Sequence, residues 1–124
     1  MIKKTVKGTG IDLSDAISSA IDKVVASIDK YVDPSDTSAL VDIEVGKTTN
    51  HHRSGEIFRA EINFHSRIGT LRAEAEKEDL YVALVAAKDE IVESLRSKKS
   101  KRTDFIKRSG AKIKNMIRGL YSRD

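Results

Sequence analysis

The clearest structural pattern in this chain lies at residues 58–76, FRAEINFHSRIGTLRAEAE. Apolar residues occupy every second position from Phe58 to Phe64, and again from Leu71 to Ala75. Such alternation places apolar side chains on one face of a strand and polar side chains on the other. The residues between the two runs, Ser66 to Gly69, suit a tight hairpin. The stretch therefore predicts two antiparallel strands with one buried face and one solvated face.

Two further strands are predicted upstream of this hairpin. Val41 to Val45 repeats the alternation, and a long polar connection from Gly46 to Gly55 separates it from the hairpin. At the N-terminus, Ile2 to Lys7 also alternates, and Gly8-Thr-Gly10 is expected to end that strand. The alternation of the three later strands is typical of an antiparallel sheet.

Two helices complete the pattern. Ser14 is a good N-cap, and apolar residues recur at helical spacing from Ile17 to Tyr31, until Asp33-Pro34 stops the helix. A second apolar stripe begins after Asp79, another N-cap candidate, and ends at Leu95. The predicted order is β-α-β-β-β-α. The predicted fold class is α+β, a two-layer sandwich with both helices packed on one face of a four-stranded sheet.

Composition excludes several classes of protein. A chain of 124 residues with 39% hydrophobic residues fits one ordinary domain with a real core. It has no cysteine, which excludes disulfide scaffolds, cysteine-ligated zinc and thiol nucleophiles. No run approaches 18 apolar residues, and no apolar segment follows the N-terminus, so we expect neither a membrane span nor a signal peptide. The expected location is the cytoplasm.

Charge divides the chain into two parts. Residues 98–124 hold ten basic and two acidic residues, a net charge of +8, whereas residues 1–97 hold 13 basic and 17 acidic residues, a net charge of −4. We therefore expect a folded domain at 1–97 and a basic C-terminal tail at 98–124. Apolar residues from Phe105 to Leu120 recur at helical spacing, which favours a tail helix that forms on a partner.

No constellation in the sequence predicts catalysis, a metal site or a cofactor. His51 and His52 are adjacent and have no third ligand at a metal-site spacing, so they are expected to be loop residues that could touch a phosphate or a base. Glutamates at 44, 61, 74 and 76 share the predicted outer sheet face with arginines at 59 and 72. Cross-strand ion pairs explain this mixture better than acid–base catalysis does. We expect the protein not to be an enzyme and to have no small-molecule substrate.

The basic segment predicts a polyanionic partner, with nucleic acid favoured over a membrane surface. Lysine and arginine side chains near phosphates release condensed counterions, so binding of this kind weakens as salt rises. Two other classes stay open. One is a general double-stranded RNA-binding module, which lacks an obligate leading strand. The other is a tail that binds membranes as a basic amphipathic helix, although it holds only two aromatic residues, Phe105 and Tyr121.

Several short motifs, in order, resemble the ribosome hibernation-promoting factor family, also called ribosome-associated inhibitor or protein Y. The matching segments are Ile11-Asp-Leu-Ser14, Ile28-Asp-Lys-Tyr31, Leu71-Arg-Ala-Glu-Ala-Glu76, Glu78-Asp-Leu-Tyr-Val-Ala83, Asp89 and Leu95-Arg96. The resemblance covers roughly residues 2–101. It implies the same β-α-β-β-β-α fold that the periodicity predicts.

The resemblance also implies a function. Members of this family bind the small ribosomal subunit in the channel between its head and body, overlap the mRNA and tRNA sites, and silence translation under stress. Basic residues on the helices make their rRNA contacts, which here implicates Lys23, Lys30, Arg96, Lys99 and Lys101. Only 27 residues follow position 97, too few for the dimerisation domain of long members, so a short form that is monomeric off the ribosome is expected.

This chain departs from many relatives in the middle of its second helix. Glu90 and Glu93 stand where those relatives carry lysine and arginine. The departure shifts the expected rRNA contacts toward Lys88, Arg96 and the basic run after the helix. The full set of predicted rRNA-binding residues is Lys23, Lys30, Lys88, Arg96, Lys98, Lys99, Lys101 and Arg102.

Overall fold

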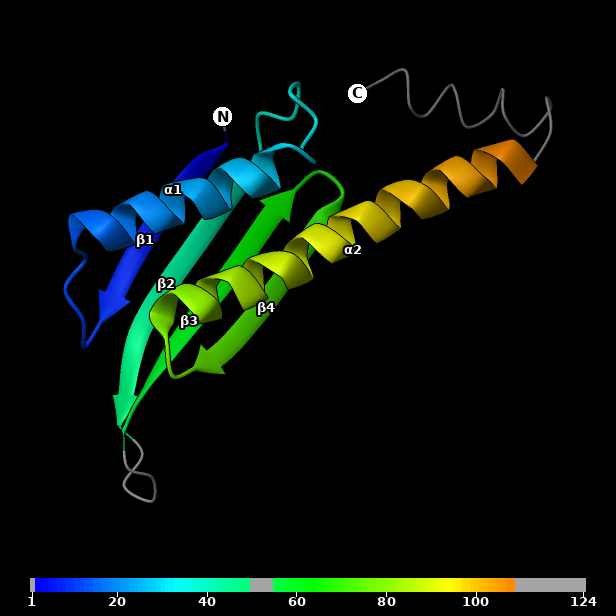
Figure 1. Ribbon diagram of the computed structural model, residues 1–124. Helices are drawn as coiled ribbons and strands as arrows, with labels where there is room; N and C mark the ends of the chain where they lie inside the picture. Colours follow the sequence, from blue (N-terminus) through cyan, green and yellow to red (C-terminus); the bar gives the residue numbers. More distant parts are fainter. Residues whose placement is uncertain (1, 50–54, 109–124) are drawn as a thin grey trace.

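The computed structural model describes residues 2–49 and 55–108, and it confirms the predicted fold class. Two helices lie side by side on one face of a four-stranded sheet, as Figure 1 shows. In chain order the elements are β1 (Lys3–Thr9), α1 (Asp15–Asp29), β2 (Leu40–Thr49), β3 (Glu56–Ser66), β4 (Gly69–Lys77) and α2 (Leu80–Arg108).

The sheet is mixed. Its strand order is β1-β2-β3-β4, and the β2–β3 and β3–β4 pairs are antiparallel, as the alternation predicts. The sheet is not fully antiparallel, because β1 pairs with β2 in parallel. The cause is the connection between them: α1 carries the chain back along the sheet, so the next strand starts again from the same end.

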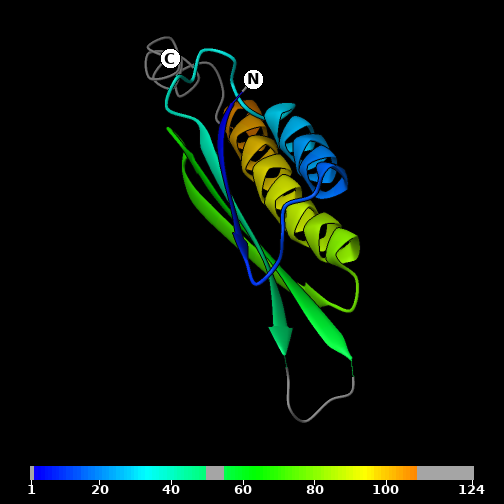
Figure 2. The same cartoon turned by 90° about the vertical axis from the view of Figure 1, so that its left-hand side faces the viewer.

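The core fills the space between the two layers, which Figure 2 shows edge-on. Ile62 and Phe64 of β3 are at most 1% exposed, and the helices cover them with Ile21 and Ile28 of α1 and Leu84 of α2. Among the described residues no polar or charged side chain is buried. The apolar face of the sheet, and the two helix faces that cover it, therefore account for the fold.

Both helices begin at the predicted caps. The Ser14 side chain accepts a hydrogen bond of 3.2 Å from the Ile17 N–H, and Asp79 Oδ1 accepts one of 2.7 Å from the Tyr81 N–H. Each cap satisfies a backbone donor that has no partner within its helix. The serine and the aspartate thus fix where the two amphipathic faces start.

Three predicted boundaries are wrong by a few residues. The first helix ends at Asp29 rather than near Tyr31, because the Tyr31 N–H bonds back to Ile28 O in a tighter turn, and the Tyr31 side chain is 37% exposed. The first strand continues through Gly8 and ends at Thr9, so the turn starts at Gly10, whose φ of 68° suits glycine. The connection after the second strand is shorter than predicted, since β2 continues to Thr49 and β3 starts at Glu56.

The second helix extends well past its apolar stripe. Its backbone is helical to Arg108, although the last buried apolar residue is Leu95. The helix therefore crosses position 97, where we expect the folded domain to end and the basic tail to begin. Residues 109–124, which hold most of the tail's apolar pattern, lie outside the described residues.

Arg67 joins the loop after α1 to the turn between β3 and β4. Its backbone N–H donates to Asp36 Oδ2 at 3.0 Å, and its guanidinium contacts Asp33 Oδ2 at 3.2 Å. Hydrogen bonds from Ser35 lower the pKa of Asp33, and those from Ser38 and the Arg67 backbone lower the pKa of Asp36. Nothing in the hydrophobic pattern predicts this contact, because it joins two loops 31 residues apart.

Replacement of Phe64 by alanine tests the core. The substitution Phe64→Ala removes a ring that is 1% exposed and leaves a cavity, so the free energy of unfolding should fall by about 3–5 kcal/mol. Urea denaturation followed by circular dichroism measures the loss. The matched control is Val82→Ala on α2, where the side chain is 52% exposed and the change should stay within about 0.5 kcal/mol. Equal effects of the two substitutions would contradict this core.

Candidate nucleic-acid interface

One flank of α1 is attached to β1. Asp22 forms an ion pair with Lys4, and Asp29 Oδ1 accepts a hydrogen bond of 3.1 Å from the Ile2 N–H. Both aspartates directly follow a core residue, Ile21 or Ile28, along the helix. The flank of α1 that directly follows its core positions therefore faces β1, and the flank that precedes them faces α2.

Lys23 lies on the outward face of α1, on the side nearer to α2. It precedes the buried Val24, and Lys30 follows it by seven residues, or about two helical turns, so the two lysines share this side. Both side chains are exposed, and neither forms an ion pair with another residue whose side chain is described. Two cations without a described ion-pair partner therefore stand on the outward face of α1, toward the side of the second helix.

The same geometry orients α2. Both helices run in the same direction on the same face of the sheet (Figures 1 and 2), so residues that directly follow a core position face the same way on each. On α2 these residues are Tyr81, Val85, Lys88, Val92 and Arg96, which follow Leu80, Leu84, Ala87, Ile91 and Leu95. Because α1 lies on the β1 side of α2, this flank faces α1.

Four of the predicted cations therefore lie on the outward side of the helix layer, near the boundary between the two helices. We call Lys23, Lys30, Lys88 and Arg96 the interhelix strip. Arg96 is exposed and makes no ion pair with another described side chain, whereas Lys88 is only 23% exposed and pairs with Asp89 at 2.7 Å. The strip offers three free cations and one cation that is partly neutralised by its neighbour.

The two glutamates of α2 lie away from this strip. Glu90 precedes the core residue Ile91, so it lies on the flank that faces β4, and Glu93 is exposed between that flank and solvent. Their negative charges are therefore not interposed between the cations of the strip.

The remaining predicted contacts cannot be placed as side chains. Their backbone belongs to α2, but their side chains lie outside the described residues. These positions are Lys98, Lys99, Lys101 and Arg102. They extend the axis of α2 beyond Leu95 by about two turns.

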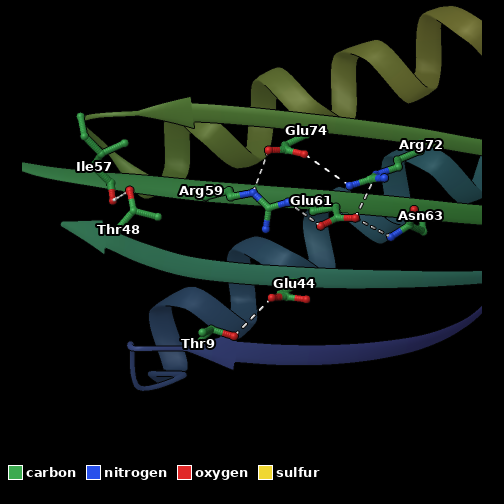
Figure 3. A network of polar contacts seen from close by, with 9 residues as sticks. All are labelled: Thr9, Glu44, Thr48, Ile57, Arg59, Glu61, Asn63, Arg72 and Glu74. Carbon is green, nitrogen blue, oxygen red and sulfur yellow. Dashed lines mark hydrogen bonds and ion pairs between the residues drawn. The ribbon is translucent and has the colours of Figure 1, made fainter. Parts of the chain in front are cut away.

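The outer face of the sheet carries paired charges, as the sequence predicts. Arg59 bonds Glu74 and Glu61, each at 2.8 Å, and Arg72 reaches Glu61 at 3.0 Å and Glu74 at 3.5 Å (Figure 3). Cross-strand register sets Glu61 beside Glu74, and the two arginines offset the repulsion between them. The hydrogen bond from Arg59 lowers the pKa of Glu74, so this carboxyl group is a poor proton donor at neutral pH.

The histidines form no site in the described part of the chain. His65 lies on the outer sheet face, 3.4 Å from Asp42 and 3.3 Å from the Thr70 hydroxyl, and about two-fifths of its side chain is exposed. Within residues 2–49 and 55–108, no group of three or more histidines and carboxylates could hold a metal ion. His51 and His52 lie outside the described residues. None of the described helices is long and apolar enough to cross a membrane.

The features missed by the sequence patterns are exposed apolar residues on α2. Tyr81, Val82 and Val85 are each more than 40% exposed, although apolar residues dominate this part of the helix. Their spacing in the sequence does indicate that they are exposed, because they fall outside the i, i+3, i+4 positions that place Leu80 and Leu84 in the core.

Together these features define a two-layer α+β protein whose helix face carries free cations and whose sheet face carries ion pairs. Residues 5–103 match the family described as Sigma 54 modulation protein / S30EA ribosomal protein. The chain therefore belongs to this family of ribosome-associated factors, which is not a class of enzymes.

Solved structures similar to this chain include the following two. The Protein Y N-terminal domain of Thermus thermophilus superposes with a TM-score of 0.58 at 27% identity, covering 77% of this chain and 96% of that one. A ribosomal subunit interface protein from Coxiella burnetii superposes with a TM-score of 0.56, covering 80% of this chain and 99% of that one. At 17% identity the second shows the fold alone. Comparison with curated protein sequences gave no significant match.

The substitution Arg59→Met tests the charge network. With the arginine in place the pKa of Glu74 lies below its ordinary value of 4.5, so the pair stabilises the fold above that pH and the contribution is lost as pH falls through the lowered pKa. In the variant the pKa of Glu74 should rise toward the ordinary value. A carboxyl titration by NMR measures it. Asp36, whose partners are Ser38 and Arg67, is the internal control and should keep its lowered pKa.

An unchanged titration of Glu74 in Arg59→Met would show that this arginine does not hold the carboxylate. A simultaneous rise in the pKa of Asp36 would instead indicate that the substitution disturbs the whole fold.

Proposed function

We propose that this protein binds the small ribosomal subunit through rRNA phosphates, occupies the mRNA and tRNA channel, and silences translation under stress. The observation that carries the proposal is the family match over residues 5–103 together with the free cations of the interhelix strip. In this proposal the protein acts by occlusion in the cytoplasm, with no cofactor and no chemical step.

The distribution of charge supports the helix face as the RNA-binding side. Lys23, Lys30 and Arg96 are exposed without a described ion-pair partner, whereas Arg59 and Arg72 on the sheet face are engaged by glutamates. A phosphate can approach a free cation without displacing a carboxylate, so counterion release favours the helix side. The backbone of α2 stays helical to Arg108, so the basic run of residues 98–102 lies on the continuation of this helix.

A general double-stranded RNA-binding module is the less favoured alternative. β1 is a full strand of seven residues, paired with β2 along its whole length and bonded to α1. Such a module needs no strand of this kind. The leading strand is thus an integral part of this fold, as the family match implies.

A charge-reversal pair tests the interface. The double substitution Lys23→Glu/Lys30→Glu should weaken binding to small subunits by at least about tenfold, because it removes two phosphate contacts and adds repulsion. Co-sedimentation at several salt concentrations measures the affinity. The slope of log K against log salt should become less negative by about 1.5, which corresponds to two lost contacts.

The matched control is Lys3→Glu/Lys7→Glu. It makes the same change in net charge, but both lysines are exposed on β1 and alternate with Lys4, which points to the helix layer. It should bind nearly as well as the unmodified chain. Equal weakening by the two pairs would mean that net charge, and not the helix face, determines binding.

The basic run is tested separately. Replacement of Arg96, Lys98, Lys99, Lys101 and Arg102 by glutamate should abolish co-sedimentation with small subunits and relieve inhibition of a cell-free translation reaction. Inhibition that persists without binding would contradict the occlusion mechanism. Binding that persists would contradict the role of this run.

A further inference from the structure

β4 is an open edge of the sheet. The strand order ends at β4, and no other described strand pairs with its outer side. An edge strand presents unpaired N–H and C=O groups that can accept another strand. The nine residues of β4 include no proline, so each of them has a backbone N–H.

The two edges of the sheet carry different charges, because β4 holds two glutamates, one arginine and one lysine. β1 carries Lys3, Lys4 and Lys7 among its seven residues, and the β1 side is further attached to α1 by Asp22 and Asp29. Lysines on an edge strand discourage strand addition. On β4 the one lysine, Lys77, is the last residue of the strand. The lysines of β1 would repel a basic segment, so β4 is the edge better suited to pairing with one.

The β4-facing flank of α2 provides a shelf above this edge. Ala86 and Glu90 precede the core residues Ala87 and Ile91 and lie toward this flank, and Ala86 is only partly buried. Val82, which is 52% exposed, points away from the sheet. Leu71 and Ala75 on the helix side of β4 are also only partly buried. A strand beside β4 would set every second side chain against this apolar surface.

The charges around the edge are mainly negative. Glu76 and Glu78 at the end of β4 and Glu90 and Glu93 on α2 are exposed and make no ion pair with another described side chain, and Lys77 is the one cation among them. Arg72 is engaged by Glu61 and Glu74. A partner that alternates apolar and basic residues would match both the shelf and the acids. A second copy of this chain would instead bring two acidic edges together.

We propose that the open edge of β4, with Ala86 and Glu90 of α2, binds an extended basic polypeptide segment as a fifth strand of the sheet. Backbone hydrogen bonds to β4 supply the affinity in this mode, and alternate side chains supply the selectivity. The site is on the far side of α2 from the interhelix strip, so the inference does not depend on RNA binding. It adds a protein partner to the nucleic-acid partner that the sequence favours.

A synthetic peptide tests this site directly. The probe is a capped heptapeptide of alternating lysine and valine, titrated into the ¹⁵N-labelled full chain. We expect amide shifts along β4 and at Ala86 and Glu90, and slower hydrogen exchange at β4 amides. The double substitution Glu76→Lys/Glu90→Lys should weaken binding by about tenfold or more. The control Asp12→Lys, an exposed charge change between β1 and α1, should leave binding unchanged.

A second probe separates strand addition from simple charge attraction. The same peptide with N-methyl groups on alternate residues keeps every charge but lacks the donors along one edge, so it should not bind. Equal binding of the methylated peptide, shifts confined to residues outside β4 and α2, or no binding of the first peptide would each overturn the proposal. The Lys23→Glu/Lys30→Glu variant should bind the peptide normally, which separates this site from the proposed ribosome contact.

Discussion

The burial of one apolar sheet face under two helices is the constraint on which the rest of this structure depends. Ile62 and Phe64 on β3 can leave water only if both helices cover them, and this requirement fixes which side of each helix points inward. Once Leu84 and Ile91 are in the core, helix geometry directs Lys88 toward α1, Arg96 toward solvent and Glu90 toward β4. The positions of the functional charges thus follow from the packing of uncharged residues.

The charge of the molecule is divided across its surface as well as along its chain. Residues 1–97 carry a net charge of −4, yet the helix face presents free cations at Lys23, Lys30 and Arg96. The negative charge is held on the sheet face, where Arg59 and Arg72 neutralise part of it, and along the open edge of β4. A single domain with a negative net charge can therefore present a positive surface to a polyanion and a negative edge to a cationic partner.

The sequence predicts elements and caps well here because local rules determine them. Period-two alternation identifies β2, β3 and β4, and the short polar side chains of Ser14 and Asp79 identify the helix starts. The parallel pairing of β1 and the Arg67 contact depend on distant parts of the chain, which no local pattern encodes. For the candidate site, residue types were predictable, but only the orientation of the helices shows that Lys23 and Arg96 share a strip and that Glu90 does not.

The central claim is that the helix face, with its interhelix strip, meets ribosomal RNA while the sheet face does not. A cryo-EM map of the full chain bound to small ribosomal subunits measures this orientation most directly. The account predicts density for the domain between the head and body of the subunit, with Lys23, Lys30 and Arg96 against rRNA phosphates and the Arg59–Glu74 network away from them. A map with the sheet face on the RNA, or with the domain outside the channel, would contradict it.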